Sequence, residues 1–181
     1  MSAADIIDAV IGREGRYSDN PADAGGATMW GITEKVARKH GYAGLMRDLP
    51  RALAVAIYTA DYIVAPGFDR VLGLSAAIGE ELVDTGVNMG PAIAGQWLQR
   101  TLNALNQRGA MWPDLVVDGA VGPASIAALG QLLQRRGADG EKVMLRALNC
   151  LQGARYIELT ESRPANEDFV YGWLLNRVEV K

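Results

Sequence analysis

A chain of 181 residues can form one moderate domain, or one domain with a small satellite, around a substantial hydrophobic core. Hydrophobic residues make up 49% of it, but no apolar run approaches the roughly 18 to 20 residues that span a bilayer, so we expect no stable membrane insertion. The net charge of −3 gives no general support for nucleic acid as a partner.

The chain has one histidine, His40, and one cysteine, Cys150. These counts exclude an intrachain disulfide and a His-rich metal site. Leu148 and Leu151 flank Cys150, which favours a buried structural thiol. His40 precedes Gly41 at a predicted helix end, which favours a surface position.

The first predicted element is a short buried helix. Ser2 and Asp5 form a typical N-terminal cap, and the apolar residues that follow recur at helical spacing: Ile6, Ile7, Val10 and Ile11. Gly12 or Gly15 marks its end. Glu14 therefore lies where a packed helix ends and can face a cleft, which makes it our candidate general acid.

Turn-forming residues follow from Arg16 onward, and Ala27 to Thr33 is predicted to be a short strand. Gly25 and Gly26 are the predicted hairpin turn. This turn would bring Asp23 and Thr28 back past the end of the first helix.

These residues resemble the glycoside hydrolase family 108 muramidases, whose signature joins Glu-Gly-x-Tyr to Asp-x-Gly-Gly-x-Thr-x-x-Gly-Ile-Thr. The matching segments here are residues 14–17 and 23–33, with Arg16 where the family usually has a second Gly. The order Glu, Asp, Thr is also similar to phage-type lysozymes, in which a helix-terminal Glu faces a β-hairpin. The resemblance implies a mainly α, lysozyme-like fold: a helical bundle with a small β-hairpin beside the catalytic Glu.

Four further helices are predicted from their caps and apolar spacing. One follows Thr33 and ends near Gly41, one opens at Leu49-Pro50 and runs to about Val64, one is capped by Ser75, and one begins at Pro91. In the last of these helices, Gln96 and Gln99 are expected on the wetter side.

The helix after Ser75 ends in a second match to the family, Asp84, Asn88 and Gly90, in the pattern Asp-x-x-x-Asn-x-Gly. Asp84 and Asn88 are four residues apart and share one helical face, so they could hydrogen-bond across the floor of a cleft. The alternative is a buried polar pair that pins helices together.

Residues 106–121 are the longest irregular segment, which ends in an Asp-Gly-x-x-Gly-Pro turn at Asp118. This turn and the helix after it resemble the predicted peptidoglycan-binding region that accompanies the family's muramidase motif. Asp139 is expected to cap a helix that runs to about Leu159. For the aromatic residues of the final segment, a core position is favoured over a sugar platform: Phe169, Tyr171 and Trp173.

The predicted organisation is a lysozyme-like muramidase region at residues 1–105 and a peptidoglycan-binding helical region at residues 106–181. We expect the two regions to pack as one globular unit, and a monomer is the default expectation.

Breaking a glycosidic bond requires a proton for the leaving oxygen and a carboxylate or positioned water at the opposite face of the sugar. Glu14 can supply the proton if an apolar pocket, to which Tyr17 and Trp30 contribute, raises its pKa. Asp23 and Thr28 can hold the water, and Asp19 is the rival of Asp23.

Carboxylates about 6.5 to 9.5 Å apart give inversion and those about 5 to 5.5 Å apart give retention. The sequence does not fix this distance. The resemblance to phage-type lysozymes favours inversion.

The resemblance implies an endolysin: an N-acetylmuramidase of the lysozyme class that cleaves peptidoglycan at the β-1,4 bond between N-acetylmuramic acid and N-acetylglucosamine. It assigns catalysis to Glu14, Asp23 and Thr28, and no metal or organic cofactor is needed. Substrate contacts are expected from the residues Tyr17, Trp30, Asp84 and Asn88.

Two alternatives stay open: a lytic transglycosylase, which uses one Glu and no water, and a noncatalytic peptidoglycan-binding or virion module. No secretory signal is visible at the N-terminus. We therefore expect synthesis in the host cytoplasm and holin-type release to the cell wall.

Overall fold

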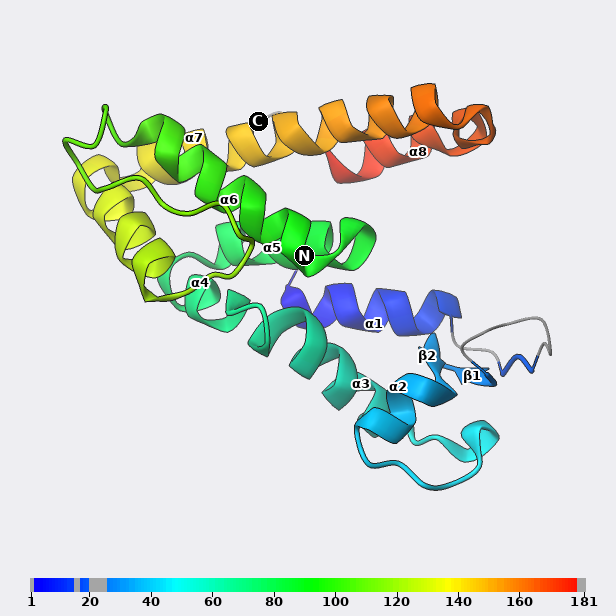
Figure 1. The fold of residues 1–181 in the computed structure, drawn as a ribbon. Coiled ribbons are helices and arrows are strands. Elements are labelled where there is room, and N and C mark those ends of the chain that lie inside the picture. Colours follow the sequence, from blue (N-terminus) through cyan, green and yellow to red (C-terminus); the bar gives the residue numbers. More distant parts are fainter. Residues whose placement is uncertain (1, 15–16, 20–25, 179–181) are drawn as a thin grey trace. The chain divides into compact units, whose positions relative to one another are not determined.

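The computed structural model describes residues 2–14, 17–19 and 26–178 of the chain. Its residues cluster into two compact units, Met1–Ala65 (unit 1) and Pro66–Lys181 (unit 2). The described residues are mainly helical with one small two-stranded antiparallel sheet (Figure 1), so the predicted lysozyme-like fold class is confirmed. No helix among the described residues is long and apolar enough to cross a membrane.

Unit 1 begins with α1 (Ala3–Glu14), which is capped as its sequence predicts. The backbone N–H of Asp5 donates to Ser2 Oγ at 3.1 Å, and the N–H of Ser2 donates to Asp5 Oδ2 at 2.9 Å. The side chains of Ile6, Ile7 and Ile11 are buried, and α1 packs against α3 (Arg51–Thr59). This packing fixes the helix that ends at Glu14.

The chain then forms a hairpin of β1 (Thr28–Met29) and β2 (Ile32–Thr33). Its turn is Trp30-Gly31, with φ values of 58° and 75°. Two consecutive positive φ angles are what a two-residue hairpin turn requires. The prediction of one strand from Ala27 to Thr33 is therefore wrong, because the chain reverses at this turn.

Ser18 also pairs with Thr28, through backbone hydrogen bonds of 3.0 and 2.8 Å in both directions. Ser18 thus lies alongside β1. Of the predicted turn Gly25-Gly26, Gly25 lies outside the described residues and Gly26 has a φ of 75°.

The rest of unit 1 is α2 (Glu34–Lys39), η1 (Met46–Asp48), α3, and the π-helical η2 (Ala60–Val64) that continues α3. Thr33 caps α2 by accepting from the N–H of Val36. His40 ends α2 as predicted, but it is half-buried, because its Nε2 lies 3.1 Å from both carboxylate oxygens of Asp61.

Unit 2 contains α4 (Phe68–Leu74), α5 (Ala76–Met89), α6 (Pro91–Leu105), α7 (Pro123–Ser162), η3 (Pro164–Asn166) and α8 (Glu167–Arg177). Helix α5 packs against α4, α6 and α7. The core between these helices contains fully buried leucines, among them Leu82, Leu98, Leu102, Leu129 and Leu148. The predicted division after residue 105 falls inside unit 2 and stays a prediction.

Helix α7 has one interruption, at Gly137, where φ is 53° and ψ is −138°. The sequence predicts two helices here, the second starting at Asp139. In the structure the helical segments meet at Gly137 instead, because a glycine tolerates a positive φ at little cost.

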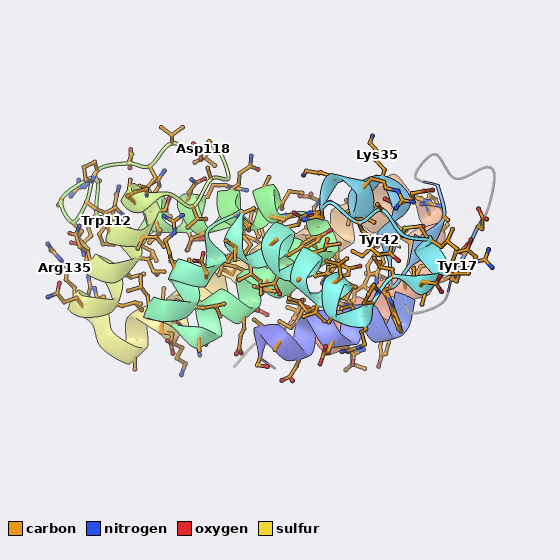
Figure 2. All side chains as sticks on the ribbon, turned by 90° about the horizontal axis from the view of Figure 1, so that it is seen from below. Tyr17, Lys35, Tyr42, Trp112, Asp118 and Arg135 are labelled. Atoms are coloured by element: carbon orange, nitrogen blue, oxygen red, sulfur yellow. The ribbon has the colours of Figure 1, made fainter. Side chains whose placement is uncertain are left out.

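The burial predictions for Gln99 and Cys150 are wrong. Gln99 is 2% exposed rather than on the solvent-facing side of α6, because its amide hydrogen-bonds to the loop before α7. Its Nε2 donates to Asp118 Oδ1 at 2.8 Å, and its Oε1 accepts from the N–H of Gly119 at 2.8 Å. Figure 2 shows Asp118 on this loop. Cys150 is exposed, because the buried stripe of α7 passes through Leu148 and Gln152 on another face.

Ser75 is the N-cap of α5, with its Oγ accepting from the N–H of Ile78 at 3.1 Å and donating to Glu141 at 2.6 Å. Ser75→Ala is expected to lower the free energy of unfolding by about 1 to 2 kcal/mol, since it removes the cap and the bond to Glu141. Chemical denaturation measures this loss. Ser162→Ala, which removes an exposed hydroxyl, is the control, and an equal effect of both changes would contradict the capping role.

Candidate active site

Helix α1 carries Glu14 at its last position, and the apolar packing of this helix holds that end in unit 1. The side chain of Glu14 and the whole of Asp23 lie outside the described residues. Their predicted roles therefore stay predictions. The described residues around the β1–β2 hairpin define the rest of the candidate site.

Five polar residues gather at the hairpin, and we call them the hairpin cluster: Tyr17, Asp19, Thr28, Glu34 and Arg47. The hydroxyl of Tyr17 donates to Asp19 Oδ2 at 3.1 Å. The guanidinium of Arg47 lies 5.8 Å from the centroid of the Tyr17 ring, since β1 packs against η1. Figure 2 shows Tyr17 beside the cyan η1 segment. An aromatic face, a cation and carboxylates are thus presented together.

The surroundings of Tyr17 favour its neutral form. Desolvation and the hydrogen bond to the Asp19 carboxylate raise the pKa of Tyr17, and the nearby Arg47 opposes this shift. The phenol therefore stays protonated and remains a hydrogen-bond donor at neutral pH. One oxygen of Asp19 is its acceptor.

Thr28 and Glu34 face the glycine-rich side of the hairpin. Thr28 Oγ1 donates to the carbonyl of Gly26 at 3.4 Å. A Cβ on Gly26 would lie 3.2 Å from Glu34 Oε2, so the absence of a side chain there leaves room for this carboxylate. Glu34 Oε1 also accepts from Arg38 at 2.7 Å. The carboxylate of Glu34 is therefore held next to the glycine-rich motif.

Trp30, predicted to bind substrate, is anchored within unit 1. Its Nε1 donates to the carbonyl of Leu49 at 2.8 Å, and its own carbonyl accepts from the hydroxyl of Tyr58 at 3.4 Å. The indole is half-buried and cannot swing freely. Its contact with substrate stays a prediction.

Glu34 and Arg47 are members of the cluster that the motifs do not predict. The sequence does offer a pointer to Glu34, because this residue directly follows Thr33 at the end of the family motif. No sequence pattern indicates Arg47, since its place beside Tyr17 depends on how η1 packs against β1.

Asp84 and Asn88 lie in unit 2, and they do not bond to each other through their side chains. Asp84 Oδ1 accepts from Arg177 at 2.9 Å, and its Oδ2 lies 3.5 Å from Gln152 Nε2. Asn88 donates to the backbone carbonyl of Asp84 at 2.7 Å. This geometry fits the alternative in which Asp84 pins helices together, here α5 to α7 and α8. A substrate contact of either residue stays a prediction.

Tyr156 lies next to this network and is 4% exposed. Among the described residues, neither its hydroxyl nor Oε1 of Gln152 has a hydrogen-bond partner. Burial raises the pKa of Tyr156 to about 12, with the charges of Asp84 and Glu81 acting in the same direction and that of Arg177 against it. The hydroxyl therefore resists ionisation in the folded chain.

Tyr156→Phe is expected to leave the stability at pH 7 equal or higher, because it removes a buried hydroxyl that lacks a partner. In the wild type, this tyrosine's contribution is fully present below its unfolded pKa of about 10 and is lost as the pH rises toward 12. The resulting loss in the free energy of unfolding of the wild type, relative to Tyr156→Phe, reaches roughly 2 to 3 kcal/mol. Unfolding curves from pH 8 to 12 measure it, with the exposed Tyr171→Phe as the control; parallel curves for wild type and Tyr156→Phe would contradict this account.

Comparisons with known proteins agree with the motifs. Residues 7–90 match the family model described as Glycosyl hydrolase 108, and residues 93–178 match the one described as Predicted Peptidoglycan domain. The chain is also similar to the solved structure of Brucella abortus SagA, with a TM-score of 0.52 and 22% identity over 95% of each chain. At this identity the likeness supports the fold alone. No curated protein matches the chain.

The first match contains the helix end and the hairpin, including all five of the predicted site residues in unit 1: Glu14, Tyr17, Asp23, Thr28 and Trp30. The second contains the Asp118 turn and both helices after it. A glycoside hydrolase region followed by a peptidoglycan domain supports an enzyme that degrades peptidoglycan. The chain therefore carries a region that matches the glycosyl hydrolase 108 family, residues 7–90, followed by a region that matches a predicted peptidoglycan domain, residues 93–178.

Proposed function

We propose that the chain is an N-acetylmuramidase, which hydrolyses the β-1,4 bond between N-acetylmuramic acid and N-acetylglucosamine in peptidoglycan. The observation that carries this proposal is the glycosyl hydrolase 108 match over residues 7–90, which contains Glu14, Asp23 and Thr28 in their motif. The peptidoglycan domain that follows supports the substrate class.

In the proposed reaction, the carboxylic acid of Glu14 gives its proton to the glycosidic oxygen as the bond from that oxygen to the sugar C1 breaks. A water molecule held by Asp23 and Thr28 attacks C1 from the opposite face and gives its proton to Asp23. The anomeric configuration is inverted. The hydroxyl oxygen of Tyr17, whose proton is donated to Asp19, can accept a hydrogen bond from the sugar, and the cation of Arg47 supplies positive charge beside it.

Asp23 remains our choice over Asp19 as the water-holding acid. Asp19 Oδ2 already accepts from the hydroxyl of Tyr17, which makes Asp19 a positioning residue in this proposal. Asp23→Ala is then expected to lower the rate strongly, whereas Asp19→Ala acts through Tyr17 and has the smaller effect. The reverse order would exchange their roles.

Mass spectrometry of fragments released from purified peptidoglycan tests the bond and the reaction type. Hydrolysis by a muramidase gives reducing N-acetylmuramic acid ends. Ends in the 1,6-anhydro form would show a lytic transglycosylase instead, and an absence of fragments would favour a noncatalytic binding module. Both of these outcomes contradict the proposal.

The proposed biological role is that of an endolysin, made in the host cytoplasm and released to the cell wall by a holin. Expression in a bacterial host, with and without a coexpressed holin, tests this role. We expect lysis only when both are present. Lysis without the holin would contradict the release route.

A further inference from the structure

Helix α8 differs on its two sides. The inward side is anchored to other helices of unit 2: the rings of Tyr156 and Trp173 lie 5.2 Å apart, and Arg177 bonds to Asp84. Leu174 and Val178 also lie near Gly153 of α7. These contacts hold the helix firmly within unit 2.

The outward side of α8 carries residues at positions i, i+3, i+4 and i+7, which share one helical face: Asp168, Tyr171, Gly172 and Leu175. The side chain of Tyr171 is 77% exposed and that of Leu175 is 68% exposed. The expectation that the aromatic residues here belong to the core is wrong for Tyr171, and also for Phe169, which is 58% exposed. We call the four-residue face the α8 stripe.

Gly172 leaves room within the stripe. A Cβ at this position would meet no described atom within 4 Å outside its own helix backbone and chain neighbours. The stripe therefore combines a largely exposed aromatic residue, an open position next to it, and an aliphatic side chain one helical turn away. Carboxylates lie at its beginning, from Asp168 and the exposed Glu167.

We propose that the α8 stripe is a binding surface for the glycan strand of peptidoglycan, with Tyr171 as its stacking platform. This inference rests on the proposed function and adds the residues through which unit 2 would hold the substrate. The match of residues 93–178 to a predicted peptidoglycan domain covers the whole of α8.

The chemistry of the stripe fits a sugar. The C–H face of a pyranose ring is apolar and packs on an aromatic ring, while its hydroxyl and acetamido groups remain free for hydrogen bonds. Asp168 and Glu167 are acceptors for those O–H and N–H groups. Exposed Tyr171 thus supplies the apolar contact and the neighbouring carboxylates supply the polar ones.

Two other occupants fit the stripe less well. The carboxylates of Glu167 and Asp168 would be repelled by an anionic lipid surface. A stable protein interface buries about 800 Å² per partner with roughly 20 to 30 residues a side, far more than the stripe offers. One or two sugar rings match its length, because residues a helical turn apart lie about 5 to 6 Å from each other.

The test uses the full chain and its retention on insoluble purified peptidoglycan. Tyr171→Ala is expected to weaken binding by about three- to tenfold, and Tyr171→Phe, which keeps the ring, is expected to restore it. Val116→Ala is the matched control, because Val116 is also 77% exposed in unit 2 but lies on the loop before α7. Thermal melting of all variants confirms that each is folded.

Retention of Tyr171→Ala equal to that of wild type would overturn the inference. So would a loss in Tyr171→Ala of binding to vesicles of anionic phospholipid, or of self-association in sedimentation, since either would assign the stripe to another occupant. Cleavage of short soluble peptidoglycan fragments is measured beside retention. Normal retention without cleavage by the wild type would contradict the proposed enzyme but not the binding surface.

Discussion

Glu14→Gln is expected to abolish peptidoglycan cleavage while leaving the melting temperature nearly unchanged. The amide keeps the size of the acid but has no proton of suitable acidity for the leaving oxygen. Loss of general acid catalysis lowers a rate by about a hundred- to ten-thousandfold. Glu14 closes α1 after its buried residues, so the change should disturb little of the packing.

Release of soluble fragments from purified peptidoglycan measures this effect, and calorimetry measures the stability. Glu158→Gln is the matched control, because it makes the same chemical change at an exposed carboxylate of unit 2. We expect this control to retain full activity. Normal activity of Glu14→Gln would contradict the role of Glu14 as the general acid.

Gly95→Ala is expected to have the largest effect on stability. The backbone of Gly119 passes so close to α6 that a Cβ on Gly95 would overlap its carbonyl oxygen and lie 2.8 Å from its carbonyl carbon. Gly119 itself has a φ of 82°, and a Cβ added to it would lie 2.6 Å from the carbonyl oxygen of Ala92. The added methyl group must push the loop away and break its bonds to Gln99.

We expect a loss of about 1 to 3 kcal/mol or more from this overpacking, which thermal unfolding measures. Gly130→Ala is the control, since this glycine lies within α7 with no described atom within 4 Å of the added Cβ outside its own helix. An alanine there should stabilise the helix by up to about 1 kcal/mol. Equal melting temperatures for the two variants would contradict the close approach of the loop.

The helices of this chain could be predicted from their caps. Ser2, Thr33 and Ser75 each cap the helix that the sequence assigns to them, because capping depends on residues within three positions. The small sheet is harder to predict from the sequence. Its turn at Trp30-Gly31 places a tryptophan at a positive φ, which local preference disfavours and the bond from its indole to Leu49 helps to hold.

Predictions that depended on distant partners were less successful. Gln99 is buried because a loop about twenty residues later supplies its hydrogen-bond partners. Helical periodicity cannot predict where that loop packs. Asp84 is bonded to Arg177 from the far end of the chain, so its family motif alone could not tell a substrate contact from a structural pair. Arg47 joins the hairpin cluster for the same kind of reason, through the packing of η1 on β1.

The central claim is that Glu14 drives hydrolysis of the glycan strand with water as the nucleophile. Digestion of purified peptidoglycan in heavy-oxygen water, with wild type and Glu14→Gln in parallel, tests it most directly. We predict that the wild type places the heavy oxygen on the reducing N-acetylmuramic acid end and that Glu14→Gln releases no labelled fragment. Unlabelled anhydro ends from the wild type, or labelled ends from the variant, would contradict the account.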